Sequence, residues 1–129
     1  MILDTNALSA FADGEPGVLA EIGRAPRIEV PCIVLGEFLF GIAQSRRRSE
    51  YELWINQTLE AAQYLDLTVD TAAKYAEVRL ELKRAGTPIP SNDMWIAALC
   101  RQHALPLLSR DRRFESVKGL RRIGWQGII

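Results

Sequence analysis

The sequence predicts an α/β protein in which a mostly parallel sheet is covered by helices on both faces. Short apolar segments alternate with longer helical patterns along the chain, which is the order expected of βαβ units. The 129 residues lie within the usual size range of one compact domain. Hydrophobic residues make up 48% of the chain and charged residues 25%, which is typical of a globular core with a polar surface. We therefore expect residues 1–129 to form a single domain.

An apolar opening and a pair of capping residues begin the chain. Residues 1–3 are a short apolar run, which favours a strand. Thr5 and Asn6 follow as helix-capping residues, so a helix is expected to begin there. Pro16 suits the first turn of a second helix. The alternation of apolar and polar residues at 27–30 then predicts the second strand.

The rest of the chain repeats this alternation. Residues 33–44 predict a helix, and residues 47–63 continue with helical spacing that makes Leu53, Trp54 and Leu59 core positions. The remaining predicted elements are a strand at 64–67, a long helix from Asp70 or Thr71 to Gly86, a helix at 92–102 with Ser91 as its N-cap, and strands at 105–108 and 120–124.

The net charge is zero, because sixteen basic residues balance sixteen acidic ones. Taken alone, this balance argues against a polyanion as partner, since no overall field attracts one. The distribution is skewed, however, with seven basic and two acidic residues from Arg101 onward. Thirteen of the sixteen bases are arginine, the side chain better suited to bidentate phosphate contacts.

Cysteine spacing and the start of the chain favour a cytoplasmic protein with no membrane association. Cys32 and Cys100 lie far apart without a CxxC pattern, so neither a zinc site nor a disulfide framework is predicted. No leader with a basic and then an apolar region precedes Asp4. The most apolar stretch, residues 33–42, contains Glu37 and is far shorter than the ~20 residues that span a bilayer.

Four acidic residues are candidates for chemistry. Asp4 ends the first predicted strand and Asp111 follows the strand at 105–108, where open α/β sheets bind ligands, although either could simply cap a turn. Glu37 lies inside a strongly apolar helix, where burial disfavours a carboxylate unless it is paired or bound to metal. Asp93 lies in the first turn of an apolar helix, where the helix dipole also favours it. Converging carboxylates would hold Mg²⁺ or Mn²⁺ and suit phosphodiester hydrolysis.

The order of four motifs resembles the PIN-domain ribonucleases, in particular the VapC-type toxins of toxin–antitoxin pairs. These motifs are MILDTN at the start, Gly36-Glu37, IPSNDMWIAA from Ile89, and LLSRDRRF from Leu107. The resemblance covers nearly the whole chain. It implies a three-layer α/β/α PIN-like fold, an endoribonuclease that depends on Mg²⁺ or Mn²⁺, a homodimer, and a small cognate antitoxin that blocks the site.

The resemblance also assigns residues. The family's acidic quartet of catalytic and metal-binding residues matches Asp4, Glu37, Asp93 and Asp111, with Asp4 and Asp93 as the first choices for direct ligands. Supporting polar positions match Asn6, Asn92 and Ser109, where the family more often has Thr at the last of these. The arginines beside the last acid are candidates for binding RNA phosphates, namely Arg110, Arg112 and Arg113.

Two other functions remain open at this point. The chain could be a catalytically inactive PIN-like module that binds a protein, or a PIN nuclease that processes RNA outside a toxin–antitoxin pair. A phosphoaspartyl phosphatase would commonly have a second Asp where Asn6 stands. If four acids fill a metal site, twelve remain against sixteen bases, so the surface that meets RNA can be positive. No motif indicates which RNA is cut.

Overall fold

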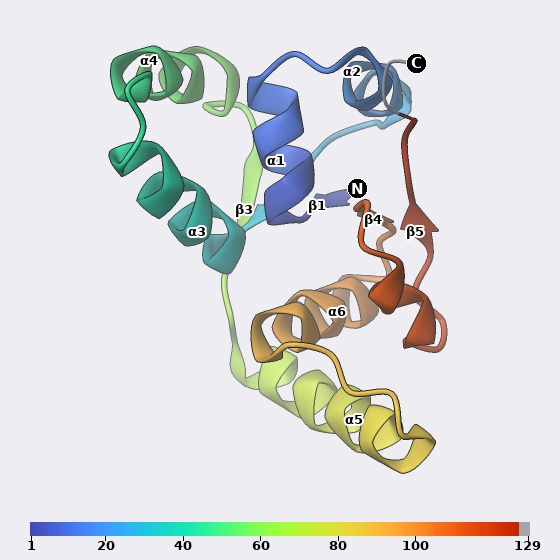
Figure 1. Cartoon of the computed structure of the whole chain (residues 1–129). Coiled ribbons are helices and arrows are strands. Elements are labelled where there is room, and N and C mark those ends of the chain that lie inside the picture. Colours follow the sequence, from blue (N-terminus) through green and yellow to red (C-terminus); the bar gives the residue numbers. More distant parts are fainter. Residues whose placement is uncertain (127–129) are drawn as a thin grey trace.

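The computed structural model describes residues 1–126 and contains one five-stranded parallel sheet with the strand order β3-β2-β1-β4-β5. The strands are β1 (Ile2–Leu3), β2 (Glu29–Pro31), β3 (Gln63–Leu65), β4 (Leu107–Leu108) and β5 (Arg122–Ile123). Figure 1 shows α1 to α4 on one side of the sheet and α5 and α6 on the other. The structure therefore confirms the predicted three-layer α/β/α fold.

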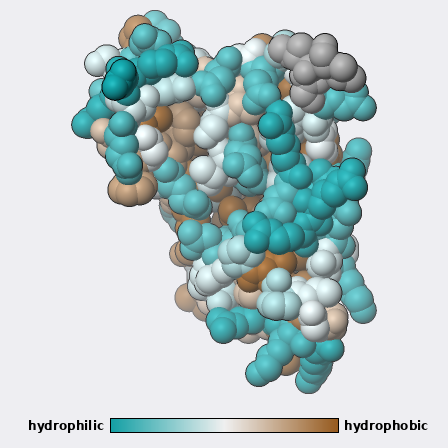
Figure 2. All heavy atoms as spheres, viewed as in Figure 1, coloured by the Kyte–Doolittle hydropathy of each residue, from teal (hydrophilic) through white to brown (hydrophobic). Residues whose placement is uncertain are grey.

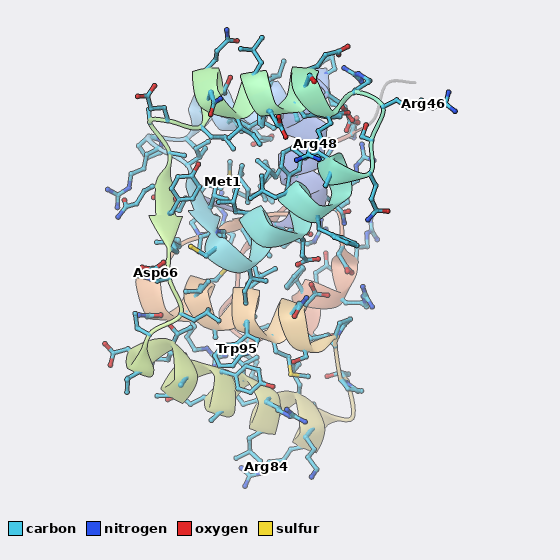
Figure 3. The ribbon with its side chains drawn as sticks, turned by 90° about the vertical axis from the view of Figure 1, so that its left-hand side faces the viewer. Met1, Arg46, Arg48, Asp66, Arg84 and Trp95 are labelled. Carbon is cyan, nitrogen blue, oxygen red and sulfur yellow. The ribbon has the colours of Figure 1, made fainter. Side chains whose placement is uncertain are left out.

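The helices of the two outer layers differ in how many of their side chains are buried. Their bounds are α1 (Thr5–Ala12), α2 (Pro16–Arg24), α3 (Cys32–Ala43), α4 (Arg48–Thr58), α5 (Val69–Ala85) and α6 (Ser91–His103), and a short 3₁₀ helix, η1, covers Arg112–Ser116. The α6 helix is the most buried, because it packs between the sheet and α5. On its outer side Trp95 stacks on Tyr75 of α5, with ring centroids 4.0 Å apart (Figure 3).

The core follows the two central strands. All side chains of β1 and β4 are buried, and Ile2 lies between Glu29 of β2 and Leu107 of β4 in the parallel register. Apolar side chains of α1 and α6 cover the two faces of these strands, which is why such short strands read as uninterrupted apolar runs. The same two strands carry the loops that contain Asp4 and Ser109.

Helix starts differ from the sequence prediction by a few residues. Asp4, not Thr5 or Asn6, caps α1, because its carboxylate accepts the backbone N–H of Ala7 at 2.8 Å. The α5 helix begins at Val69 instead of at Asp70 or Thr71. Thr68 caps it by exchanging side-chain and backbone hydrogen bonds with Thr71. At both starts, several consecutive polar residues are of a type that can cap a helix. The local sequence does not show which of them is the N-cap, because this depends on the path of the preceding backbone.

The helix predicted at 47–63 is too long, because α4 ends at Thr58. Leu59 is completely buried, and the chain turns there so that Gln63 can enter the sheet as the first residue of β3. Leu53, predicted as a core position, is 57% exposed, whereas Trp54 packs edge-on against Phe11. When a helix has few apolar residues, their helical spacing alone does not determine which face is buried.

Gly17 in α2 provides a stability prediction, because a Cβ atom there would lie 2.6 Å from the carbonyl oxygen of Gln126. Gly17→Ala is expected to lower the free energy of unfolding by about 1–3 kcal/mol through this overlap. Gly23 lies in the same helix with no atom within 4 Å of its Cβ position. Gly23→Ala should therefore be neutral or stabilising by up to about 1 kcal/mol. Urea unfolding of both variants tests this, and equal effects would contradict it.

Within residues 1–126, the chain has no helix that combines the length and apolarity needed to cross a bilayer. The longest helix in that range, α5, has charged residues distributed along its length.

Candidate active site

The strand order places the candidate site at the centre of the sheet's carboxyl edge. From β1 the chain proceeds outward through β2 to β3, and it then returns to the other side of β1 with β4 and β5. Ligands of open α/β sheets bind at such a reversal of strand order, here between β1 and β4. Asp4 directly follows β1, Ser109 directly follows β4, and Asp111 lies two residues beyond Ser109. Figure 2 shows hydrophilic side chains gathered across the middle of one face, at the level of β4 and η1.

Asp4 is the most buried of the four predicted acids, with only 4% of its surface exposed. One carboxylate oxygen accepts the N–H of Ala7, and the other accepts the hydroxyl of Ser109. Burial raises the pKa of Asp4, and the negative charges of Asp111 and Glu37 raise it further, against the opposing effect of both hydrogen bonds. A cation near this carboxylate would favour its ionised form and so lower this pKa.

Ser109 connects two of the predicted acids. Its hydroxyl donates to Asp4 and accepts the backbone N–H of Asp111 at 3.0 Å. Its own carbonyl oxygen accepts a hydrogen bond of 2.9 Å from Nη1 of Arg122 on β5. Because Ser109 is fully buried, these contacts fix the loop after β4 relative to Asp4.

Sequence reasoning missed Arg122. The guanidinium of Arg122 contacts the Ser109 carbonyl and pairs with Glu115 at 2.7 Å, so it attaches the loop after β4 to both β5 and η1. The only signal in the sequence is a basic residue in the strand predicted at 120–124. That signal does not identify a partner, because the pairing of β4 with β5 is not contained in the local pattern.

Asp111 is held by Arg113. The Asp111 carboxylate caps η1 by accepting the backbone N–H of Arg113 at 2.9 Å. The Arg113 guanidinium also binds both carboxylate oxygens, with Nε 3.0 Å from each and Nη2 2.6 Å from Oδ2. These bonds lower the pKa of Asp111, so this acid is charged under most conditions.

Asp93 approaches the same group of charges from the other layer. It lies in the first turn of α6, partly buried, and one of its oxygens is 3.8 Å from Nη2 of Arg113. Burial raises the pKa of Asp93, and the charges of Asp111, Asp4 and Glu37 add to this effect. The apolar run after Asp93 predicts that this residue lies at the start of a helix, and the structure places it there.

Glu37 is exposed, which corrects the prediction that its apolar helix would bury it. The apolar residues next to it, Leu39 and Phe40, are themselves 43% and 71% exposed. The α3 helix therefore has an apolar outer face in addition to the face that buries Val34, Phe38 and Ile42. Glu37 lines an open groove of about 350 Å³ together with Thr5 and Asp13. It nevertheless lies close enough to raise the pKa values of both Asp4 and Asp93.

The predicted supporting asparagines occupy matching positions. Asn6 and Asn92 both lie exposed in first helical turns, of α1 and α6 respectively, on the helices that carry Asp4 and Asp93.

The predicted RNA-binding arginines have separate environments. Arg110 pairs with Glu15 at 2.6 Å and lies over the ring of Trp125, at 4.7 Å from its centre. Arg112 lines a cavity of about 350 Å³ that Arg110, Arg122 and Trp125 also line. Arg113, by contrast, faces the acids.

The residues present suit a hard divalent cation by the chemistry of their donors, which are carboxylate and hydroxyl oxygens. Burial, and after it the negative charges of the other acids, raise the pKa values of Asp4 and Asp93. Within residues 1–126, however, no three acidic, histidine or cysteine side chains stand close enough to form a ready-made metal cluster. The acids are thus gathered within electrostatic reach of one another, and a cation would require some of their side chains to turn inward.

Ser109→Ala tests the bridge between Asp4 and Asp111. Loss of the hydroxyl removes a hydrogen bond that lowers the pKa of Asp4, so that pKa is expected to rise further, and Ser109→Thr is expected to preserve the original value. Carboxyl NMR titration of the three proteins measures the difference. An unchanged Asp4 pKa in Ser109→Ala would show that the bridge does not control this acid.

Comparison with known proteins identifies the family. The PIN domain profile matches residues 1–120, so the chain belongs to the PIN domain family. Within this family its similarity is to the VapC ribonucleases. It is 30% identical over 127 residues to Ribonuclease VapC2 of Haemophilus influenzae, with 96% of each chain covered. It is 25% identical over 127 residues to the tRNA(fMet)-specific endonuclease VapC of Salmonella typhimurium, again with 96% of each chain covered.

The fold is shared with a solved toxin–antitoxin complex. VapBC2 from Rickettsia felis, bound to a DNA fragment from its promoter, superposes with a TM-score of 0.85 at 22% identity. The match covers 97% of this chain and 98% of that chain. The similarity confirms the PIN-like arrangement of sheet and helices that the sequence resemblance implied.

Proposed function

We propose that this protein is a divalent-metal-dependent endoribonuclease and the toxin of a VapBC-type toxin–antitoxin pair. One observation carries the proposal: at the reversal point of the sheet, Ser109 links Asp4 to the backbone of Asp111 by hydrogen bonds. Asp93 lies close enough for the charges of both acids to raise its pKa. The family membership and the VapC ribonuclease relatives support the same activity. We take residues 1–129 as one PIN domain.

Each acid has a proposed role. Asp4 and Asp93 bind Mg²⁺ or Mn²⁺ directly, and Glu37 and Asp111 act directly or through water. The bound cation supplies a water of lowered pKa and neutralises charge on the leaving oxygen. Ser109 keeps the Asp4 carboxylate in place, and Asn6 and Asn92 orient water or ligands from the adjoining helix turns. Exposure suits Glu37 to a role through water better than to direct binding.

RNA binds through the arginines that follow β4. Arg110 and Arg112 line one cavity beside Asp111, and Arg113 contacts Asp111 itself. Each phosphate contact adds affinity that decreases with salt. This local positive charge accommodates a polyanion on a chain with zero net charge.

The partners follow from the family. A small antitoxin is expected to block the site, and the active protein is expected to be a cytoplasmic homodimer. The Rickettsia felis relative was solved as a VapBC complex, which supports an antitoxin partner here. The name of the Salmonella typhimurium relative makes initiator tRNA a substrate to test alongside ribosomal and messenger RNA.

Metal removal tests the activity. Purified protein is expected to cut structured RNAs with Mg²⁺ or Mn²⁺, leaving a 3′-hydroxyl and a 5′-phosphate, and to stop completely in EDTA. Excess Mg²⁺ added after the chelator should restore cutting. End-mapping by sequencing identifies the products and the substrate. Cutting that persists in EDTA would refute the metal mechanism, and an intact RNA pool together with antitoxin binding would favour the inactive module.

A further inference from the structure

Arg113 is placed differently from the other arginines near the site. Its guanidinium binds both oxygens of Asp111, and the same Nη2 atom is 3.8 Å from Asp93. Asp111 belongs to the loop after β4, whereas Asp93 belongs to α6, so one cation connects two acids from separate elements. Arg110 has its ion pair with Glu15, and Arg112 lines the cavity on the other side of the loop.

The charges explain why a cation is favourable at this position. Asp4, Glu37, Asp93 and Asp111 repel one another, and burial removes part of the water that would otherwise screen Asp4 and Asp93. Arg113 is the positive side chain that contacts two of the four within the described residues. It therefore offsets part of a repulsion that would otherwise oppose their approach.

The same contacts exclude a second cation from the same oxygens. Nε and Nη2 of Arg113 lie within 3.0 Å of the Asp111 oxygens, so those lone pairs are directed to the guanidinium. A metal that uses Asp111 must displace it. Because the Arg113 side chain is 59% exposed, it can leave toward solvent, and exposed ion pairs contribute little to stability.

We propose that Arg113 is an internal counter-ion of the acidic site, which competes with the divalent cation for Asp111 and Asp93 and is released when that cation binds. This inference rests on the proposed metal-dependent function. The released guanidinium stays within two residues of Asp111, where it is available to an RNA phosphate. Arg113 thus limits metal affinity without RNA and assists the binding of RNA once the metal is bound.

Binding of Mn²⁺ to the protein without RNA tests the competition. Arg113→Gln removes the positive charge, and titration calorimetry or the loss of the free Mn²⁺ EPR signal is expected to show about tenfold tighter binding. Arg113→Lys keeps the charge but loses the two-pronged contact, so its affinity should fall between the two. Arg112→Gln is the matched control, because it removes an arginine from the same 3₁₀ helix without touching these acids, and its affinity should equal that of the original protein.

Each result separates this inference from the proposed function. Equal or weaker Mn²⁺ binding by Arg113→Gln, in protein whose circular dichroism shows it folded, would refute the competition and leave the metal site intact. Absence of Mn²⁺ binding in all four proteins would refute both the metal site and the competition. Binding by Arg113→Gln alone would support the competition in its strongest form.

Discussion

Asp4→Asn is expected to reduce RNA cleavage by at least about a hundredfold while the protein stays folded. Replacing even an outer-shell partner of a metal site commonly costs about 10–100-fold in affinity or activity, and Asp4 is proposed as a direct ligand. The substitution removes the charge at the centre of the site. It retains an oxygen that can accept the Ala7 N–H, so the cap of α1 survives.

The folding stability of Asp4→Asn should not fall along with its activity. Burial and like charges disfavour the ionised form of Asp4, as its raised pKa indicates. A neutral amide escapes both effects, so Asp4→Asn should be at least as stable as the original protein when no metal is present, and it should lose the stabilisation that added Mg²⁺ provides. Loss of activity together with preserved or increased stability is the pattern expected of a functional acid rather than a structural one.

Asp66→Asn is the matched control. Asp66 directly follows β3, so it also lies at the carboxyl end of a strand, but that strand is at the outer edge of the sheet (Figure 3). Single-turnover cleavage and thermal unfolding of both variants with and without Mg²⁺ give the comparison. Similar losses in the two variants, or full activity in Asp4→Asn, would contradict the assignment of the site.

The sequence predicts the framework of the site better than its contacts. The apolar strands that precede Asp4 and Ser109 can be recognised from the local sequence. A buried strand must be apolar, and polar residues follow where it reaches the edge of the sheet. Strand order has no local signal, yet it is what places β1 beside β4. The resemblance to a family implied the central parallel sheet, and the pairing of β1 with β4 within it comes from the structure.

The errors have a common physical cause. Glu37 was expected to be buried because its neighbours are apolar, but hydrophobicity does not show whether a helix turns those neighbours inward or outward. Likewise, the sequence places Arg113 beside Arg110 and Arg112 but does not show that its side chain turns toward the acids. Side-chain direction in a tight loop depends on the caps and charges around it, and these become visible only when the strands are placed.

Metal affinity is expected to fall steeply as the pH falls toward the pKa values of Asp4 and Asp93. Both acids have pKa values raised above the ordinary 3.8, so protons compete with the cation at a higher pH than for exposed aspartates. Below the pKa of one such ligand, each pH unit costs about tenfold in affinity, and below both the cost is about a hundredfold. Mn²⁺ titrations from about pH 4 to about pH 8 measure this slope.

The folding stability of the metal-free protein should change in the opposite sense. Because the folded pKa values of Asp4 and Asp93 exceed the unfolded ones, the folded state holds more protons across that interval, and stability decreases as the pH rises through it. Asp111 has a lowered pKa, so its contribution to stability is present above the unfolded pKa and is lost as the pH falls through the folded pKa.

Saturating Mg²⁺ should reverse the loss of stability from Asp4 and Asp93, because the cation favours their ionised forms. Denaturant unfolding at each pH, with and without Mg²⁺, separates the two trends. Parallel pH profiles would mean that these two acids do not bind the metal, whatever the cleavage assays show.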